Sequence, residues 1–171
     1  MALYKLDEYN PNYAQEIFGG NDIKNFDVYA DDEKVGSVEN ILVDENDGRF
    51  RYFIIDTGFW VFGKKVLLPV GLARLNYENK HLFVPGLTKE QVENLPEFSE
   101  VLAIDNDYEE RVRGVYRPIV PLAMPGMFGM IGAPAPYNYT MEPYFYELTD
   151  PYFRSYEENM RNRRDFNRTK I

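Results

Sequence analysis

Short runs of apolar residues, separated by turn residues, fill positions 22–86 of the chain. In 26–30 apolar and polar side chains alternate, which is the pattern of a strand with one buried face. Residues 49–57 carry apolar side chains on both faces, since Phe50 and Ile54 point one way and Phe53 the other. Such a strand must be covered on both sides, either by a central position or by another segment.

The spacing of these runs predicts five or six short strands in a mainly β fold. Gly36 stands beside a change of phase in the apolar pattern of 35–43, which predicts a bend or a bulge. A closed barrel needs a bend of this kind and a flat sheet does not. Pro69 cannot donate to a ladder, so we expect it either on an edge strand or at a break in the strand. Together these features predict a small β-barrel with short helices.

Turn and cap residues mark the ends of the strands. The segment 46–48, Asn-Asp-Gly, lies between two strand patterns and predicts a tight hairpin. A calcium loop beginning at Asp44 fails on spacing, because the twelfth position, which needs a Glu, is Ile55. Thr88 followed by Gln91 predicts a short capped helix after the last strand.

Residues 1–21 predict a short helix ahead of the strands. Pro11 suits the first helical position and the Gly19-Gly20 pair suits a stop, so the helix spans about 11–18. Apolar side chains at several of these positions could pack on the body. We therefore expect this segment to act as an N-terminal helical clip.

Residues 98–117, which follow the barrel at 22–97, are dense in charge. We interpret them as a solvated, charged linker to the C-terminal extension. The alternative is a metal site, in which the acids between Asp105 and Glu110 supply carboxylate ligands. Glycine is absent among these acids, so no residue fixes a ligand turn, and the linker is the interpretation that we prefer.

The C-terminal extension, 118–171, begins with 24 positions, 118–141, that carry no charge and include five prolines. The prolines forbid a continuous helix, and no run of eighteen apolar residues occurs, so we expect no transmembrane segment. An uncharged arm rich in Pro, Met and aromatic residues either docks on its own barrel or crosses to a partner, and the pattern leaves both open. Met127 and Phe128 are its candidate contact residues.

Asp150-Pro151 predicts the start of a last helix. Tyr152, Tyr156 and Met160 are spaced four residues apart and predict one stripe, which we interpret as a docking face. Trp60 lies in an aromatic loop between two glycines, which is either a plug over the barrel end or an interaction tip. The candidate interaction residues are Trp60, Met127, Phe128, Tyr152 and Tyr156.

Charge narrows the classes of partner. The net charge is −9, and residues 1–117 carry all of it, with 13 Lys and Arg against 22 Asp and Glu. An acidic body disfavours nucleic acid and anionic lipid surfaces as partners. The chain has no cysteine and one histidine, His81, so it offers neither a thiolate nor a catalytic triad. We predict no catalytic residue, no cofactor and no metal ligand, and a protein that is not an enzyme.

The order of the strand patterns is distinctive. Residues 23–30 open it, Val35-Gly36-Ser37-Val38 follows, and 52–55 and 66–70 come next, ahead of the helical turn at 89–96. This order resembles the PRC-barrel family, named for the cytoplasmic domain of the photosynthetic reaction-centre H subunit. The barrels of the ribosome-maturation factors belong to the same group. The resemblance covers residues 22–97.

The resemblance implies a non-enzymatic barrel that docks onto proteins. We therefore expect a cytoplasmic interaction or assembly module, which forms homo-oligomers through its C-terminal extension. The resemblance also implies a link to photosynthetic complexes, with peripheral association to their membranes. Stand-alone cyanobacterial PRC-barrel proteins carry an aromatic extension that is similar. Two alternatives stay open: a carrier of a small ligand or divalent metal, and a binding module of the ribosome-maturation type.

Overall fold

The computed structural model of the chain describes residues 3–20, 22–58, 63–100, 104–120 and 137–169, with side chains as far as Arg163. The described residues form one seven-stranded sheet, which confirms the mainly β class. Its strands, in spatial order, are β5 (Lys65–Pro69), β4 (Phe50–Asp56), β3 (Glu33–Asp44), β2 (Asp27–Ala30), β7 (His81–Val84) and β6 (Arg74–Asn76). β1 (Leu3–Lys5) pairs with the C-terminal half of β3. Six strands lie within 22–97, as predicted.

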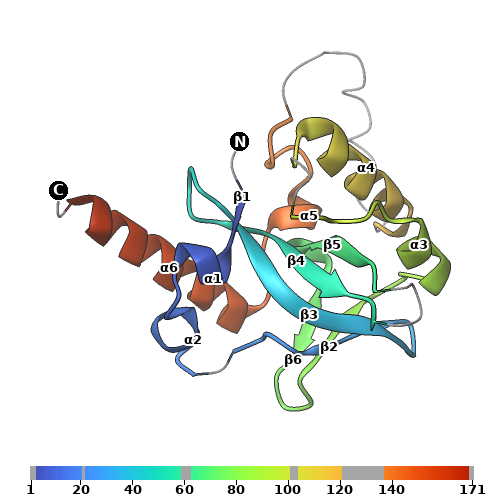
Figure 1. Ribbon diagram of the computed structural model, residues 1–171, viewed down its shortest axis with the longest axis horizontal. Coiled ribbons are helices and arrows are strands. Elements are labelled where there is room, and N and C mark those ends of the chain that lie inside the picture. Colours follow the sequence, from blue (N-terminus) through green and yellow to red (C-terminus); the bar gives the residue numbers. More distant parts are fainter. Residues whose placement is uncertain (1–2, 21, 59–62, 101–103, 121–136, 170–171) are drawn as a thin grey trace.

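The long strand β3 bends where the apolar pattern changes phase (Figure 1). Its ladder with β2 shifts register beside Gly36, and its ladder with β4 shifts between Val38 and Asn40. A Cβ atom on Gly36 would lie only 2.3 Å from the backbone oxygen of Asp56 on β4. Only glycine therefore lets the two strands approach so closely, and the predicted bend is confirmed.

The sheet curls, but hydrogen bonds do not close it into a barrel within the described residues. β5 and β6 are the two ends of the strand order, and the short 3-10 turn η2 (Val70–Leu72) connects them. The expectation of a closed barrel is corrected in this respect. The helix α5 (Pro143–Tyr146) packs over η2, since a Cβ atom on Gly71 would lie 2.5 Å from the backbone oxygen of Tyr144.

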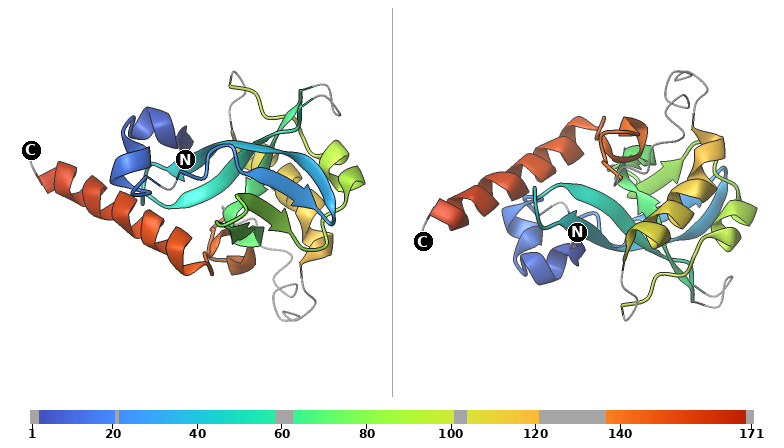
Figure 2. Two further views of the ribbon diagram at one scale, coloured as in Figure 1. Left: turned by 90° about the horizontal axis from the view of Figure 1, so that it is seen from below. Right: turned by 90° about the horizontal axis from the view of Figure 1, so that it is seen from above.

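Helices surround the sheet. They are α1 (Leu6–Tyr9), α2 (Tyr13–Glu16), α3 (Lys89–Asn94), α4 (Asn106–Tyr116), η3 (Arg117–Ile119), α5 and the long α6 (Pro151–Thr169). Figures 1 and 2 show α1, α2 and α6 at one end and α3 and α4 at the other. The capping box of Thr88 and Gln91 on α3 is present, and Asp150 accepts a hydrogen bond from the Phe153 amide at the start of α6.

Residues 106–116 correct the interpretation of this region as a solvated linker. They form α4, in which Tyr108, Val112 and Tyr116 are buried at intervals of four residues. Glu109 and Arg113 are buried with them. The segment is an amphipathic helix whose apolar stripe packs on the sheet. Its many charged residues made the apolar stripe hard to recognise in the sequence.

The two-sided strand β4 is covered by the C-terminal extension. Phe50 and Phe53 lie 5.1 and 5.3 Å, centroid to centroid, from Phe153 of α6. The prediction that Phe50 faces away from Phe53 is therefore wrong, because the β3–β4 ladder shifts register beside Phe50 and breaks the alternation there. On the other face, Tyr52 lies 5.5 Å from Tyr146 of α5. The described part of the extension therefore packs on the chain's own sheet. In that part of the chain, no helix has the length and apolar character needed to cross a bilayer.

Candidate functional site

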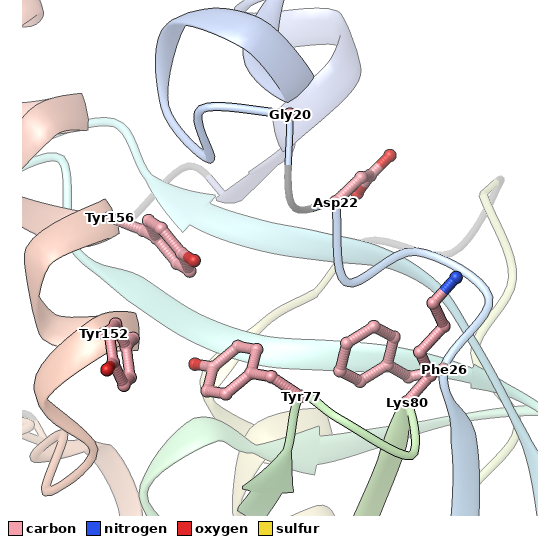
Figure 3. A pocket seen from close by; sticks show the side chains of 7 residues that line it. All are labelled: Gly20, Asp22, Phe26, Tyr77, Lys80, Tyr152 and Tyr156. Carbon is pink, nitrogen blue, oxygen red and sulfur yellow. The ribbon is translucent and has the colours of Figure 1, made fainter.

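A cleft opens where α6 passes the turn between β6 and β7 (Figure 3). We call it the aromatic cleft, and its volume is about 390 Å³. Three separate segments supply its walls: the loop before β2, the β6–β7 turn, and the first two turns of α6. The lining residues are Gly20, Asp22, Phe26, Tyr77, Lys80, Tyr152 and Tyr156.

Tyr77 is the central ring of the aromatic cleft. Its centroid lies 6.1 Å from Phe26, 5.5 Å from Tyr152 and 6.4 Å from Tyr156, with interplanar angles of 73°, 71° and 79°. In such edge-to-face pairs one ring presents its edge to the face of the other, so the ring faces of a cluster point in different directions. The arrangement lets a ligand meet more than one ring face at a time.

Tyr77 also ties the β6–β7 turn to α6. Its hydroxyl donates to Oδ1 of Asp150 at 3.0 Å, and the same oxygen accepts the backbone N–H of Phe153 at 2.9 Å. Burial, with the charge of Asp150 as the next cause, raises the pKa of Tyr77 above its usual value. The hydroxyl is therefore protonated at neutral pH, and the cap of α6 also holds one wall of the cleft in place.

The polar groups of the cleft lie opposite α6 (Figure 3). Asp22 accepts hydrogen bonds from the Tyr13 hydroxyl and from the Lys24 backbone N–H, both at 2.9 Å. Lys80 is exposed at the end of the β6–β7 turn, with a backbone φ of 56°. The cleft thus offers ring faces, one carboxylate and one ammonium group. These groups suit binding.

A second group of tyrosines lies buried between β4, α4 and residues 137–146. We call it the sealed cluster, and its members are Tyr52, Glu109, Arg113, Tyr139 and Tyr146. Oε1 of Glu109 accepts hydrogen bonds from the hydroxyls of Tyr52 at 2.9 Å and Tyr139 at 2.8 Å. The Tyr146 hydroxyl lies 2.6 Å from that of Tyr52 and accepts from Arg113 at 3.1 Å.

The members of the sealed cluster satisfy one another. Burial raises the pKa of Tyr146 to about 12, although Arg113 opposes the shift. Every hydroxyl in the cluster therefore stays protonated near neutral pH, and its proton is directed to a partner inside the protein. We interpret the cluster as a structural latch that holds α4 and the segment before α6 on the sheet.

The structure brings two of the predicted interaction residues together. Tyr152 and Tyr156 both line the aromatic cleft, Tyr152 being exposed and Tyr156 half-buried. Met160, predicted on the same stripe, is instead buried. Trp60, Met127 and Phe128 lie outside the described residues.

Sequence reasoning missed the other half of the cleft. Asp22, Phe26, Tyr77 and Lys80 come from loops and turns whose local patterns carry no functional motif. An aromatic residue in the polar turn after β6 was the one available hint, since a solvated turn gains nothing from Tyr77. Among the residues with described positions, no group of three His, Asp or Glu side chains is arranged to hold a metal ion.

Comparison with known proteins agrees with the architecture. A segment of 83 residues, 47% of this chain, is 37% identical to a protein of Deinococcus radiodurans whose name is "Uncharacterized protein". The matched segment is 30% of that protein, so the chain spans less than a third of the length of this relative. The family model described as "PRC-barrel domain" matches residues 15–91, which include Asp22, Phe26, Tyr77 and Lys80. Over residues 15–91 the predicted resemblance to the PRC-barrel family is therefore confirmed.

Proposed function

We propose that this chain is a non-enzymatic protein-interaction module and that the aromatic cleft is its recognition site. The observation that carries the proposal is Tyr152, a large aromatic side chain that is 66% exposed at the rim of a cleft lined by three further rings. Tyrosine is enriched among the residues that dominate binding energy at protein interfaces, because its ring is apolar and its hydroxyl can donate.

The position of the cleft supports the same function. One wall belongs to the PRC-barrel segment, 15–91, and the other belongs to the extension that follows it. A recognition site built in this way can differ between proteins that share the barrel, since each can carry its own extension. The barrel then serves as a scaffold, and the site lies where a second segment packs on it.

The chemistry of the cleft favours binding over catalysis. The pKa of Tyr77 is raised by burial and by Asp150, which makes its hydroxyl a donor and a poor general base. The carboxylate of Asp22 already accepts two hydrogen bonds. Neither group is paired with a nucleophile in the cleft lining.

A carrier of a small ligand is the second candidate, because a volume of about 390 Å³ lies within the range of about 300–1,000 Å³ that ligand pockets occupy. The described residues give no support to a metal carrier. A cytoplasmic location and a link to photosynthetic complexes come from the family resemblance and stay predictions. Homo-oligomer formation through the extension is a prediction of the same kind.

Photo-crosslinking tests the proposed function. A benzoylphenylalanine residue replaces Tyr152 in one variant and Tyr4, which is 41% exposed on β1, in a matched control. After irradiation of the native host cells, we expect a discrete protein adduct from position 152 and none of the same mass from position 4. Identical adducts from both positions, or no protein adduct from 152, would contradict the proposal. Native mass spectrometry of the purified chain checks the carrier alternative.

A further inference from the structure

We propose that the aromatic cleft recognises a cationic side chain, lysine or arginine, from a basic segment of a partner protein. The inference rests on the proposed function, because it names the chemistry of the group that the same cleft receives. Three observations carry it: the geometry of the rings, the carboxylates beside them, and a site within the chain that already holds a cation in the same way.

That internal site is formed by Arg51. Its guanidinium carbon lies 3.9 Å from the ring centroid of Tyr139 and 5.8 Å from that of Tyr146. The two rings are 4.8 Å apart and nearly perpendicular, at 81°. Two carboxylates complete the site, since Arg51 donates to Asp47 at 2.7 Å and to Asp44 at 3.4 Å. A perpendicular tyrosine pair with adjacent carboxylates therefore binds a guanidinium group in this protein.

The aromatic cleft repeats the arrangement at the surface. Tyr77 and Tyr152 are 5.5 Å apart at 71°, and Tyr77 and Tyr156 are 6.4 Å apart at 79°. One carboxylate, that of Asp22, lines the cleft, and a second, that of Asp150, lies behind the lining and accepts a hydrogen bond from the Tyr77 hydroxyl. The exposure of Tyr152 gives solvent, and therefore a partner's side chain, access to the rings. A cation within about 6 Å of such ring faces is attracted by their quadrupoles.

Charge favours a basic partner over an acidic one. The chain has a net charge of −9, all of it in residues 1–117, which provide Asp22 and Tyr77. Long-range attraction would bring a basic segment to this body and repel an acidic one. A cluster of aromatic rings and carboxylates also favours a cation over a neutral apolar side chain. The cation interacts with both the rings and the carboxylates, whereas the apolar side chain interacts with the rings only.

Lys80 is the feature that sharpens the inference. It lines the same cleft, and its ammonium group would repel an incoming cation and attract an anion. If the cleft binds cations, Lys80 limits the affinity, and its removal must tighten binding. If the cleft binds anions, Lys80 supplies the attraction, and its removal must weaken binding. One substitution therefore gives opposite signs for the two chemistries.

Fluorescence anisotropy with labelled peptides tests the inference on the full chain. The probes are four ten-residue Gly/Ser peptides that carry three lysines, three arginines, three acetyl-lysines or three glutamates. We expect the lysine and arginine peptides to bind and the acetyl-lysine and glutamate peptides to bind at least tenfold more weakly. Acetyl-lysine keeps the length of the side chain and removes its charge, so it isolates the cation.

The variants locate the binding. Tyr152→Ala should weaken binding of the lysine peptide by about fivefold to tenfold, which is the scale of a partly exposed cation–π contact. Lys80→Gln should tighten it by about twofold to fivefold, through the loss of one like charge near the surface. Tyr4→Ala, the matched exposed tyrosine on β1, should leave it unchanged. Circular dichroism before each titration confirms that the variants fold.

Four outcomes would overturn the inference. If the glutamate peptide binds the wild type and binds Lys80→Gln more weakly, the cleft is a binding site for anions. Equal binding by Tyr152→Ala and the wild type assigns the lysine peptide to the acidic surface at large. Self-association in light scattering at the titration concentrations, abolished by Tyr152→Ala, assigns the cleft to a second copy. A specific protein cross-link at position 152, without binding of the lysine or arginine peptide, would support the proposed function and refute the inference that the cleft binds a cation.

Discussion

Two groups of tyrosines pack against the same sheet but differ in their exposure to solvent. In the sealed cluster, Tyr52, Tyr139 and Tyr146 are buried and each hydroxyl meets a group inside the protein. In the aromatic cleft, Tyr77 is anchored to Asp150, whereas Tyr152 is largely exposed. The same residue type forms a buried cluster on one side and the proposed recognition surface on the other. What differs is whether the described part of the chain covers the rings.

The covering segment decides the difference. Residues 137–146 lie over β4, and a salt bridge between Arg117 and Glu142 at 2.8 Å holds them to the end of α4. Burial alone would raise the pKa of Glu142, but the hydrogen bond from Arg117 and that from Tyr144 leave it lowered. Glu142 therefore contributes stability above its ordinary pKa of 4.5, and this contribution is lost as the pH falls below that value.

The largest expected effect comes from opening the sealed cluster. Arg113→Met removes the guanidinium that donates to Tyr146 and lies 3.9 Å from Glu109, and it leaves a buried carboxylate without its cation. Breaking a buried ion pair from one side costs about 3–5 kcal/mol, because the remaining charge stays desolvated. We expect a loss of this size in the free energy of unfolding, measured by urea denaturation.

Arg49→Met is the matched control for Arg113→Met. The Arg49 side chain is 48% exposed, and its nearest carboxylate, on Asp47, is 4.0 Å away. An exposed pair of this kind contributes about 0–1 kcal/mol. If Arg113→Met cost no more than Arg49→Met, the sealed cluster would not be a latch and the contrast with the cleft would fail.

A smaller effect separates the two faces of α6. Phe153→Ala removes a buried ring that packs on Phe50 and Phe53, and it should lower the free energy of unfolding by about 3 kcal/mol. The adjacent substitution, Tyr152→Ala, removes an exposed ring and should change it by less than about 0.5 kcal/mol. Urea denaturation of the two variants side by side measures both values. Similar losses from the two variants would show that Tyr152 supports the fold and is not a recognition residue.

The local parts of this architecture could be predicted from the sequence. Alternation predicted β2, a run with apolar residues on both faces predicted β4, the Asn-Asp-Gly segment predicted the hairpin between β3 and β4, and Gly36 predicted the bend. Each of these features depends on neighbours along the chain. The parallel pairing of β2 with β7 and the course of α5 over η2 depend on distant segments, and no local pattern encodes them.

The stripe on α6 shows why the candidate site was only partly predictable. Tyr152, Tyr156 and Met160 share one helical spacing, but the residues that face the sheet are Phe153, Glu157 and Met160. Because Glu157, at the centre of the buried stripe, is polar, the apolar pattern alone does not indicate this stripe. The predicted stripe still includes two residues of the aromatic cleft. Tyr152 and Tyr156 lie beside the buried stripe of α6, and at this position they line the cleft.

Glu157 provides the smallest and most specific prediction. It is buried against the start of β4, where it accepts a hydrogen bond from the Phe50 backbone N–H at 3.0 Å. Burial raises its pKa above 4.5, although Phe50 and the charges of Arg49, Arg51 and Arg161 oppose the shift. The folded state thus binds the proton more tightly than the unfolded state does. This contribution to stability is fully present below pH 4.5 and is lost as the pH rises through the raised pKa.

Glu157→Gln keeps an acceptor for the Phe50 amide and removes the charge. The free energy of unfolding of Glu157→Gln, relative to that of the wild type, should therefore increase as the pH rises from 4 to 7. Urea denaturation of both proteins at each pH measures this difference. All other titrating groups are shared by the two proteins, so the difference between the two curves isolates Glu157. A difference that stays constant over this range would refute the assignment.

Glu157→Leu separates the hydrogen bond from the charge. It removes both, and it leaves the Phe50 amide buried without an acceptor, which costs about 1–3 kcal/mol at every pH. If the Leu and Gln variants were equally stable, the bond to Phe50 would not fix the position of α6. The position of the wall that carries Tyr152 and Tyr156 would then depend on the other contacts of α6, among them the packing of Phe153 and the Asp150 cap. If only the Leu variant is destabilised, the hydrogen bond between the Phe50 amide and the side chain at position 157 holds α6, and with it this wall of the cleft, against β4.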